Sequence, residues 1–211
     1  MSTLVMNHPQ MGRTLAISFV WSSEDKDTGM EWVNRVQGLA PAIMHTVAET
    51  GPAAWLEVVN ALCPYGVWGG DRTVSLPRLS ETAAKIIGKH VEKMPSDVAN
   101  GLCIHELTGP SAKKNPSSCF GAREPHFMLE LIGSTLDPSN MDGSQAWIAG
   151  FHKELSECGE ALKGAYVSLS KPGDCPVSDC FGDDWEFLLG LKRTHDPEGV
   201  FSLAIPRLSE D

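Results

Sequence analysis

The sequence predicts an α+β fold, in which helices pack on one face of a mixed or antiparallel sheet. Short runs rich in β-branched and aromatic residues alternate with longer runs of helical periodicity. Two of the strand-like runs follow one another across a polar connection rich in Gly, Pro and Ser, as antiparallel neighbours do. The chain has 211 residues and 42% of them are apolar, which is enough to build the core of a single domain over residues 1–211.

The first predicted elements are a strand and a long helix. The run TLAISFVW, residues 14–21, alternates small and large side chains as a half-buried strand does. Thr28 and Glu31 have the spacing of a capping box, and apolar residues recur at helical intervals after them. Pro41 should kink this helix or split it in two, because proline removes a backbone donor.

The middle of the chain predicts a further helix and the strand pair. The run AAWLEVVNALC, residues 53–63, is ambiguous between strand and helix. Beyond it, Ser80 should cap a helix that stops before Pro95. The apolar stripe of this helix consists of Ala83, Ala84, Ile87, Val91 and Met94. The runs LCIHELTG and HFMLELIG, residues 102–109 and 126–133, predict the two antiparallel strands.

The last third of the chain predicts helix, strand and helix. Ser144 begins the clearest helical pattern, with apolar residues on one side and charged residues on the other. The run AYVSLS, residues 165–170, is expected to return to the sheet as a strand. A closing helix follows, capped by Asp183 or Asp184. One face of the sheet is left without a predicted cover.

Charge and cysteine content exclude several classes of protein. The net charge of -10 is spread along the chain, which argues against a nucleic-acid or anionic-membrane surface. No apolar stretch reaches the length of a membrane helix and the N-terminus lacks a signal pattern, so we expect a cytoplasmic protein. The six cysteines form no CxxC pair. The segment CPVSDC could close a small loop, but further ligands at metal-site spacing are missing and we expect no metal.

An ordered set of motifs occupies the second half of the chain. The runs CIHELTGPSA, CFGAREPHFMLELIG, WIAGFHKEL, GAYVSLS and CFGDDWEFLLGLKRTHDPEGVF follow in this order. They resemble the C-terminal substrate domain of berberine bridge enzyme-like FAD-linked oxidoreductases, of the vanillyl-alcohol oxidase superfamily. The tail carries the strongest part of the resemblance, to the family pattern Y-G-x-N…R-L…K…D-P…F. The matching residues there are Phe181-Gly182, Leu188, Lys192, Asp196-Pro197 and Phe201.

The resemblance implies a fungal or plant natural-product pathway and a sheet that encloses the substrate together with a flavin ring. It also implies a larger FAD-binding domain, which we expect this chain to lack. The stretch GGD, residues 69–71, is too short to cradle a pyrophosphate and is interpreted as a turn. The family's Tyr-x-Asn beside the flavin stands here as Tyr166-Val167-Ser168. We therefore expect no cofactor, with FAD as the alternative.

Two acids in apolar strands are the most informative residues. Glu130 and Glu106 are costly there unless they are partnered or exposed. One interpretation is a partly desolvated carboxyl group that moves a proton on a bound metabolite, and the other is a solvent-facing or ion-paired glutamate. Tyr166 is the third catalytic candidate, and half-buried packing is equally open for it. The predicted substrate-binding residues are His105, His126, Met128 and Ser168.

The predicted function is a cofactor-independent cyclase or isomerase of secondary metabolism, Diels–Alder chemistry included, acting on a hydrophobic reactive intermediate. Two alternatives stay open, because fold does not fix function. One is the substrate-domain half of a split FAD-linked oxidoreductase, and the other is a non-catalytic binding or dimerisation module. An uncovered apolar sheet face exceeds what soluble monomers tolerate, so we also expect a homodimer through that face.

Overall fold

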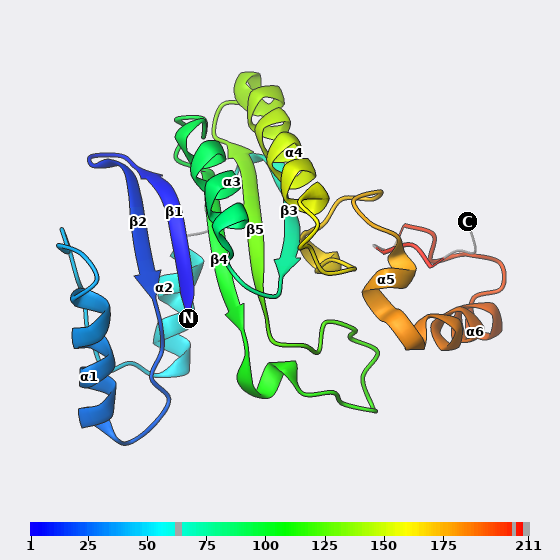
Figure 1. Ribbon diagram of the computed structural model, residues 1–211. Coiled ribbons are helices and arrows are strands. Elements are labelled where there is room, and N and C mark those ends of the chain that lie inside the picture. The colour runs from blue at the N-terminus through cyan, green and yellow to red at the C-terminus, as the bar shows by residue number, and fades with distance from the viewer. Residues whose placement is uncertain (62–64, 204–205, 209–211) are drawn as a thin grey trace.

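The computed structural model describes residues 1–61, 65–203 and 206–208, and in this part of the chain the strands form one five-stranded antiparallel sheet (Figure 1). The strands are β1 (Ser2–His8), β2 (Gly12–Ser18), β3 (Trp68–Leu76), β4 (Asn100–Leu107) and β5 (His126–Thr135). Their order is β2-β1-β4-β5-β3, so β2 and β3 form the two edges. The predicted α+β class is confirmed, and β4 and β5 are the expected antiparallel neighbours.

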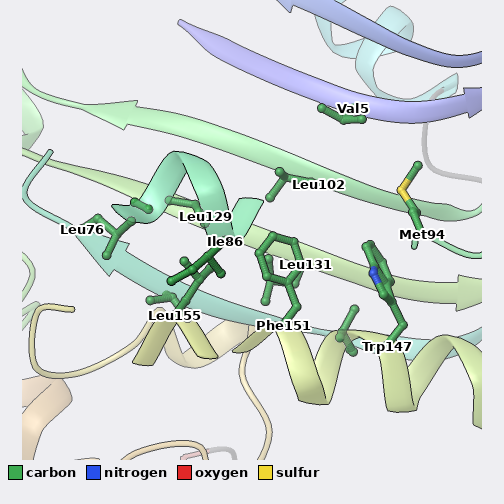
Figure 2. Close-up of a cluster of buried hydrophobic side chains, with 13 residues drawn as sticks. Val5, Leu76, Ile86, Met94, Leu102, Leu129, Leu131, Trp147, Phe151 and Leu155 are labelled. Atoms are coloured by element: carbon green, nitrogen blue, oxygen red, sulfur yellow. The ribbon is translucent and has the colours of Figure 1, made fainter. Parts of the chain in front are cut away.

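Helices α3 (Glu81–Glu92) and α4 (Met141–Glu157) lie together over one face of the sheet in Figure 1. Ser80 accepts a hydrogen bond from the backbone N–H of Ala83 at 3.1 Å, which confirms Ser80 as the N-cap of α3. Figure 2 shows the core that forms between these helices and the strands. Its members are Val5, Val74, Leu76, Ala83, Ile86, Met94, Leu102, Leu129, Leu131, Trp147, Ile148, Phe151 and Leu155.

Helix α4 approaches strand β5 closely at Gly133. A Cβ atom at this position would lie 2.7 Å from Cδ1 of Ile148 and 2.9 Å from the carbonyl oxygen of Ser144. Glycine therefore allows the helix backbone to approach the strand. Helices α3 and α4 are also joined directly, because Nε1 of Trp147 donates a hydrogen bond to the carbonyl oxygen of His90 at 2.9 Å.

Helices α1 (Lys26–Gln37) and α2 (Pro52–Ala61) lie on the β1–β2 side of the molecule (Figure 1). Gly29 is the buried residue of α1, and α2 has no buried residue. The run at 53–63 that fitted strand or helix is thus helical as far as Ala61, and its last two residues lie outside the described ranges. Within those ranges, no helix has the length and apolar character needed to span a membrane.

Helix α1 begins and ends earlier than predicted. Asp25 is its N-cap, and its carboxylate accepts a hydrogen bond from the N–H of Thr28 at 3.1 Å. The capping box predicted at Thr28 is therefore wrong, because an acid three residues earlier caps the helix first. The helix ends at Gln37, before Pro41, so the proline lies beyond it and neither kinks nor splits it.

Strands β1 and β3 are missing from the sequence prediction. The stretch at residues 69–71, interpreted as a turn, lies inside β3, where Gly69 pairs with Ser134 and Gly70 with Gly133. A Cβ atom on Gly69, whose φ is +134°, would lie 2.9 Å from Cα of Ser134. These glycines therefore allow the two strands to pair closely, and the chain does not change direction there.

The strand predicted at residues 165–170 is a short 3₁₀ turn, η3 (Val167–Leu169). One backbone bond ties the preceding segment to the edge strand β3, from the N–H of Leu162 to the carbonyl oxygen of Ser75 at 2.8 Å. The chain then turns, since the N–H of Leu169 donates to the carbonyl oxygen of Tyr166 at 2.9 Å. Residues that favour strands therefore adopt a turn here, which shows that tertiary context overrides their β propensity.

The tail motif with Asp196 closes the turn after the last helix. Helices α5 (Val177–Phe181) and α6 (Trp185–His195) lie away from the sheet (Figure 1). Asp184, one of the two predicted caps, occupies the N-cap position of α6, but its side chain makes no capping hydrogen bond. The carboxylate of Asp196 accepts hydrogen bonds from the N–H groups of Val200 at 2.7 Å and Phe201 at 3.1 Å. The D-P…F pattern of the tail therefore has a local structural role.

Candidate functional site

The face of the sheet turned away from α3 and α4 carries a band of polar strand residues, and we call it the site face. Side chains alternate along a strand, so the neighbours of the core residues Leu102 and Leu131 point to this face. The register places Cys103, Glu130 and Thr73 opposite one another on β4, β5 and β3. The two adjacent rows are His105, Met128 and Ser75, and Gly101, Ile132 and Asp71.

Glu130 and His105 form an ion pair on the site face. Nε2 of His105 donates a hydrogen bond to Oε2 of Glu130 at 2.9 Å, and the two side chains are 28% and 17% exposed for His105 and Glu130 respectively. The pKa of His105 is raised to about 9, first by the hydrogen bond to Cys103 and then by that to Glu130, while burial opposes the shift. His105 is therefore protonated near neutral pH, and the carboxylate of Glu130 keeps a charged partner.

The second ring nitrogen of His105 faces two further groups. Nδ1 lies 4.0 Å from Sγ of Cys103 and 3.2 Å from Oγ of Ser2, which belongs to β1. Cys103 and His105 are two residues apart on β4, so their side chains share one side of the strand. The thiol of Cys103 is free. His105 thus links polar groups from three neighbouring strands.

Asp71 is a second acid on the site face, and the sequence prediction missed it. Its pKa is raised to about 6, first by burial and then by the charge of Glu130, while Lys171 acts in the opposite direction. Among the described residues, Oδ1 of Asp71 is buried and has no hydrogen-bond partner. A carboxyl group in these surroundings titrates near neutral pH and can donate a hydrogen bond when protonated.

The segment after α4 borders the site face along β3. The N–H of Tyr166 donates to Oγ1 of Thr73 at 3.2 Å, and Oγ of Ser170 lies 2.9 Å from the same oxygen. The ring of Tyr166 is 37% exposed and meets the ring of Phe120 edge to face, with centroids 6.1 Å apart. Thr73 belongs to the row of Glu130, so Tyr166 lies at the end of that row.

The structure brings four predicted site residues to the site face or its edge. Glu130 and His105 contact each other, Met128 lies opposite His105 in the register, and Tyr166 borders the face through Thr73. Met128 is 7% exposed but does not belong to the main core cluster. The roles predicted for these side chains stay predictions.

The other three predicted residues have different surroundings. Glu106 lies opposite Phe127 and therefore points to the side of the sheet that carries the core, away from Glu130. His126 shares the side of β5 that carries Met128 and Glu130, but it is 3% exposed and its Nδ1 lies 2.6 Å from the carbonyl oxygen of Glu124. Ser168 is exposed on η3. The structure thus separates Glu106 from Glu130, and the roles predicted for His126 and Ser168 stay predictions.

The site face fits one side of an FAD site and not the whole of it. A pyrophosphate is held by a helix N-terminus or a glycine-rich loop. At this face the described residues form strands, and the segment that contains Tyr166 runs along its edge. The buried, unpartnered Oδ1 of Asp71 could meet a polar group of a ring system or substrate. The residues present could thus face the ring of FAD but would not hold its phosphates.

The chain is similar to an FAD-linked oxidoreductase over almost its full length. It is 28% identical over 202 residues to the FAD-linked oxidoreductase aurO of Gibberella zeae, which covers 94% of this chain and 40% of that protein. No family model matches the chain.

Solved structures of oxidoreductases share its fold. GilR, an oxidoreductase that catalyses the terminal step of gilvocarcin biosynthesis, aligns with a TM-score of 0.67 and 16% identity over 93% of this chain and 45% of its own. 6-Hydroxy-D-nicotine oxidase from Arthrobacter nicotinovorans aligns with a TM-score of 0.67 and 14% identity, also over 93% and 45%. The resemblance to part of an FAD-linked oxidoreductase is thereby confirmed. The chain spans less than half the length of each of these proteins.

Proposed function

We propose that this chain forms the substrate-side wall of an FAD-linked oxidoreductase of natural-product biosynthesis, with FAD held by another part of the protein or by a partner chain. The observation that carries the proposal is the Glu130–His105 pair at 2.9 Å on the face without α3 and α4. The likeness to aurO and to GilR supports this function, an alternative in the sequence analysis, more than the cofactor-independent cyclase.

In this function Glu130 is the base. The charged His105 is hydrogen-bonded to the carboxylate of Glu130. The pair is half-buried, so few water molecules compete with a substrate for this carboxylate. Bound FAD would supply the redox chemistry by accepting a hydride equivalent. Asp71, when protonated, would donate a hydrogen bond to a substrate oxygen, and the hydroxyl of Tyr166 would orient the substrate at the end of the row.

Exposed apolar side chains outside the sheet support the need for a partner surface. Trp32, Ile43 and Tyr65 are 46%, 81% and 90% exposed, and Phe187 and Phe201 in the tail are 65% and 73% exposed. In the proposed arrangement an FAD-binding part covers such side chains, in line with the greater length of the relatives. The single-domain organisation and the homodimer expected from the sequence stay predictions.

The test begins with flavin content. The tagged protein is purified from cells that make it, and its visible flavin absorption is recorded. It is then assayed with the intermediate that accumulates when its gene is deleted, in air and under nitrogen. We expect flavin to purify with the chain and oxygen to be consumed. A colourless protein that converts the intermediate under nitrogen would instead establish the cyclase, and binding without turnover would establish the non-catalytic module.

The role of Glu130 has a matched control within the sheet. Glu130→Gln keeps the shape of the side chain and removes its base, so kcat/KM should fall by roughly 10²–10⁴-fold. Glu106→Gln makes the same change on the opposite side of the sheet and should leave kcat/KM within about threefold. Equal losses in both variants would exclude Glu130 as the base.

A further inference from the structure

Cys103 has surroundings that suit a reactive sulfur. Its Sγ lies 4.0 Å from Nδ1 of His105, and Nε2 of the same ring donates to Glu130 at 2.9 Å. We propose that Cys103 is an activated nucleophile, positioned beside the charged His105 ring, through which the site face binds electron-poor alkenes conjugated to a carbonyl group, quinones included. The proposal concerns the chain alone and does not rest on the function proposed above.

The side chains of Cys103, His105 and Glu130 are arranged as in sites that activate a nucleophile. A nucleophile, a nitrogen base and a group that orients the base make up such sites. Cys103 and His105 come from alternate positions of one strand, and Glu130 lies opposite Cys103 on the next strand. Both ring nitrogens of His105 are engaged, Nε2 by Glu130 and Nδ1 by Cys103 and Ser2. The ring is therefore fixed from two sides, with one nitrogen toward the sulfur.

Charged groups surround the sulfur on the site face. The pKa of His105 is raised to about 9, so the ring carries a positive charge at neutral pH beside Cys103. Across the strands, Glu130 lies on β5 and Asp71 on β3, and Asp71 has a pKa raised to about 6. Lys171, from the segment after η3, lies near Asp71 and opposes the negative charge there. The β1 residues at this position, Ser2 and Leu4, are uncharged.

The reaction needs no oxidant or reductant. The thiolate attacks the alkene carbon β to the carbonyl group and forms a C–S bond, and the alkene π electrons move to the carbonyl oxygen as an enolate. The imidazolium of His105 gives its proton to the α carbon, which leaves a neutral adduct and a neutral imidazole. Soft, polarisable sulfur suits this class of electrophile.

Other described cysteines lack this arrangement. The pKa of Cys175 is raised to about 12, first by burial and then by Cys180, so its thiol stays protonated. Cys158 packs against the core. Cys119 is exposed and serves as an internal reference. Because Cys103 is less exposed than Cys119, an unactivated thiol at Cys103 would react more slowly.

A metal ion fits the same side chains less well. One ligand atom from each of Cys103, His105 and Glu130 can be chosen so that all lie within 4.8 Å of one another. A single cation bound to one ring nitrogen of His105 would also have to reach both the sulfur and the carboxylate from that side of the ring. The structure places them at opposite nitrogens, so a cation would have to break one of the existing contacts.

The test is competitive alkylation with N-ethylmaleimide, an electron-poor alkene of the proposed class. The purified chain is treated with limiting reagent at pH 6 and pH 9, and modification of each cysteine peptide is measured by mass spectrometry. We expect Cys103 to react about tenfold faster than Cys119 at pH 6. This ratio should fall at pH 9, where about half of His105 has lost its charge and Cys119 also ionises. Slower reaction of Cys103 than of Cys119 at pH 6 would overturn the proposal.

Variants separate activation from simple access. His105→Gln should remove the advantage of Cys103 at pH 6 while the rate at Cys119 stays unchanged. His45→Gln, a change at an exposed histidine outside the sheet, should alter neither rate. An unchanged rate at Cys103 in His105→Gln would show that the imidazolium plays no part. The ratio in the unmodified protein decides the question even if His105→Gln does not fold.

Discussion

Nε2 of His105 donates to Oε2 of Glu130 at 2.9 Å, so the stability of the protein depends on the charge of this histidine. The pKa of His105 is raised from 6.5 to about 9 in the folded chain. A raised pKa in the folded state means that the protonated ring stabilises the fold. That contribution is complete below the unfolded value and is lost as the pH rises through the folded value.

His105→Gln should therefore destabilise the protein most at low pH. We expect its free energy of unfolding to fall by about 1–2 kcal/mol at pH 6, with solvent screening taken into account. The difference from the unmodified protein should shrink as the pH rises through about 9. Urea unfolding at a series of pH values measures this, with His45→Gln as the reference. A destabilisation that does not change with pH would contradict the charged state of His105.

The glutamates show what strand alternation alone can and cannot predict. Alternation within HFMLELIG puts Glu130 on the side of Met128 and Ile132, and alternation within LCIHELTG puts Glu106 on the side of Leu102, as in the structure. Alternation alone does not tell which of the two sets of side chains on a strand faces the helices. That follows from the packing of α4 on Leu129 and Leu131, which turns Glu130 away from the core. Only the register between β4 and β5 shows that the two acids lie on opposite faces of the sheet.

Asp71 escaped the sequence analysis for a different physical reason. Its neighbours Gly69 and Gly70 are typical of a turn, and this hid the alternation of the residues that follow. In β3, Val74 and Leu76 are buried in the core while Thr73 and Ser75 lie on the other side. That alternation was visible in RTVSL and extends back to Asp71. Helices α3 and α4 were predictable because their apolar periodicity runs over several turns, whereas the alternation in β1 and β3 is short.

Gly133 should tolerate no side chain. Gly133→Ala places a Cβ atom 2.7 Å from Ile148 and 2.9 Å from the carbonyl oxygen of Ser144, so α4 must shift away from β5. We expect a loss of about 1–3 kcal/mol in the free energy of unfolding. Gly143→Ala, in a helix position with open space, should be neutral or gain up to about 1 kcal/mol. Equal thermal denaturation of the two variants would argue against the close approach of α4.

The ionised carboxylate of Asp71 should lower the free energy of unfolding at neutral pH. Its pKa is raised from 3.8 to about 6, so the folded state favours the protonated acid. The stability that this acid contributes is complete below pH 3.8 and is lost as the pH rises through about 6. Asp71→Asn keeps the shape without the charge and should stabilise the protein by about 1 kcal/mol at pH 7, after a discount for solvent screening. At pH 4 the two proteins should unfold at similar urea concentrations. A variant that is less stable than the unmodified protein at pH 7 would show that the Asp71 carboxylate has a favourable partner, and the acid would then lose its place as a hydrogen-bond donor on the site face.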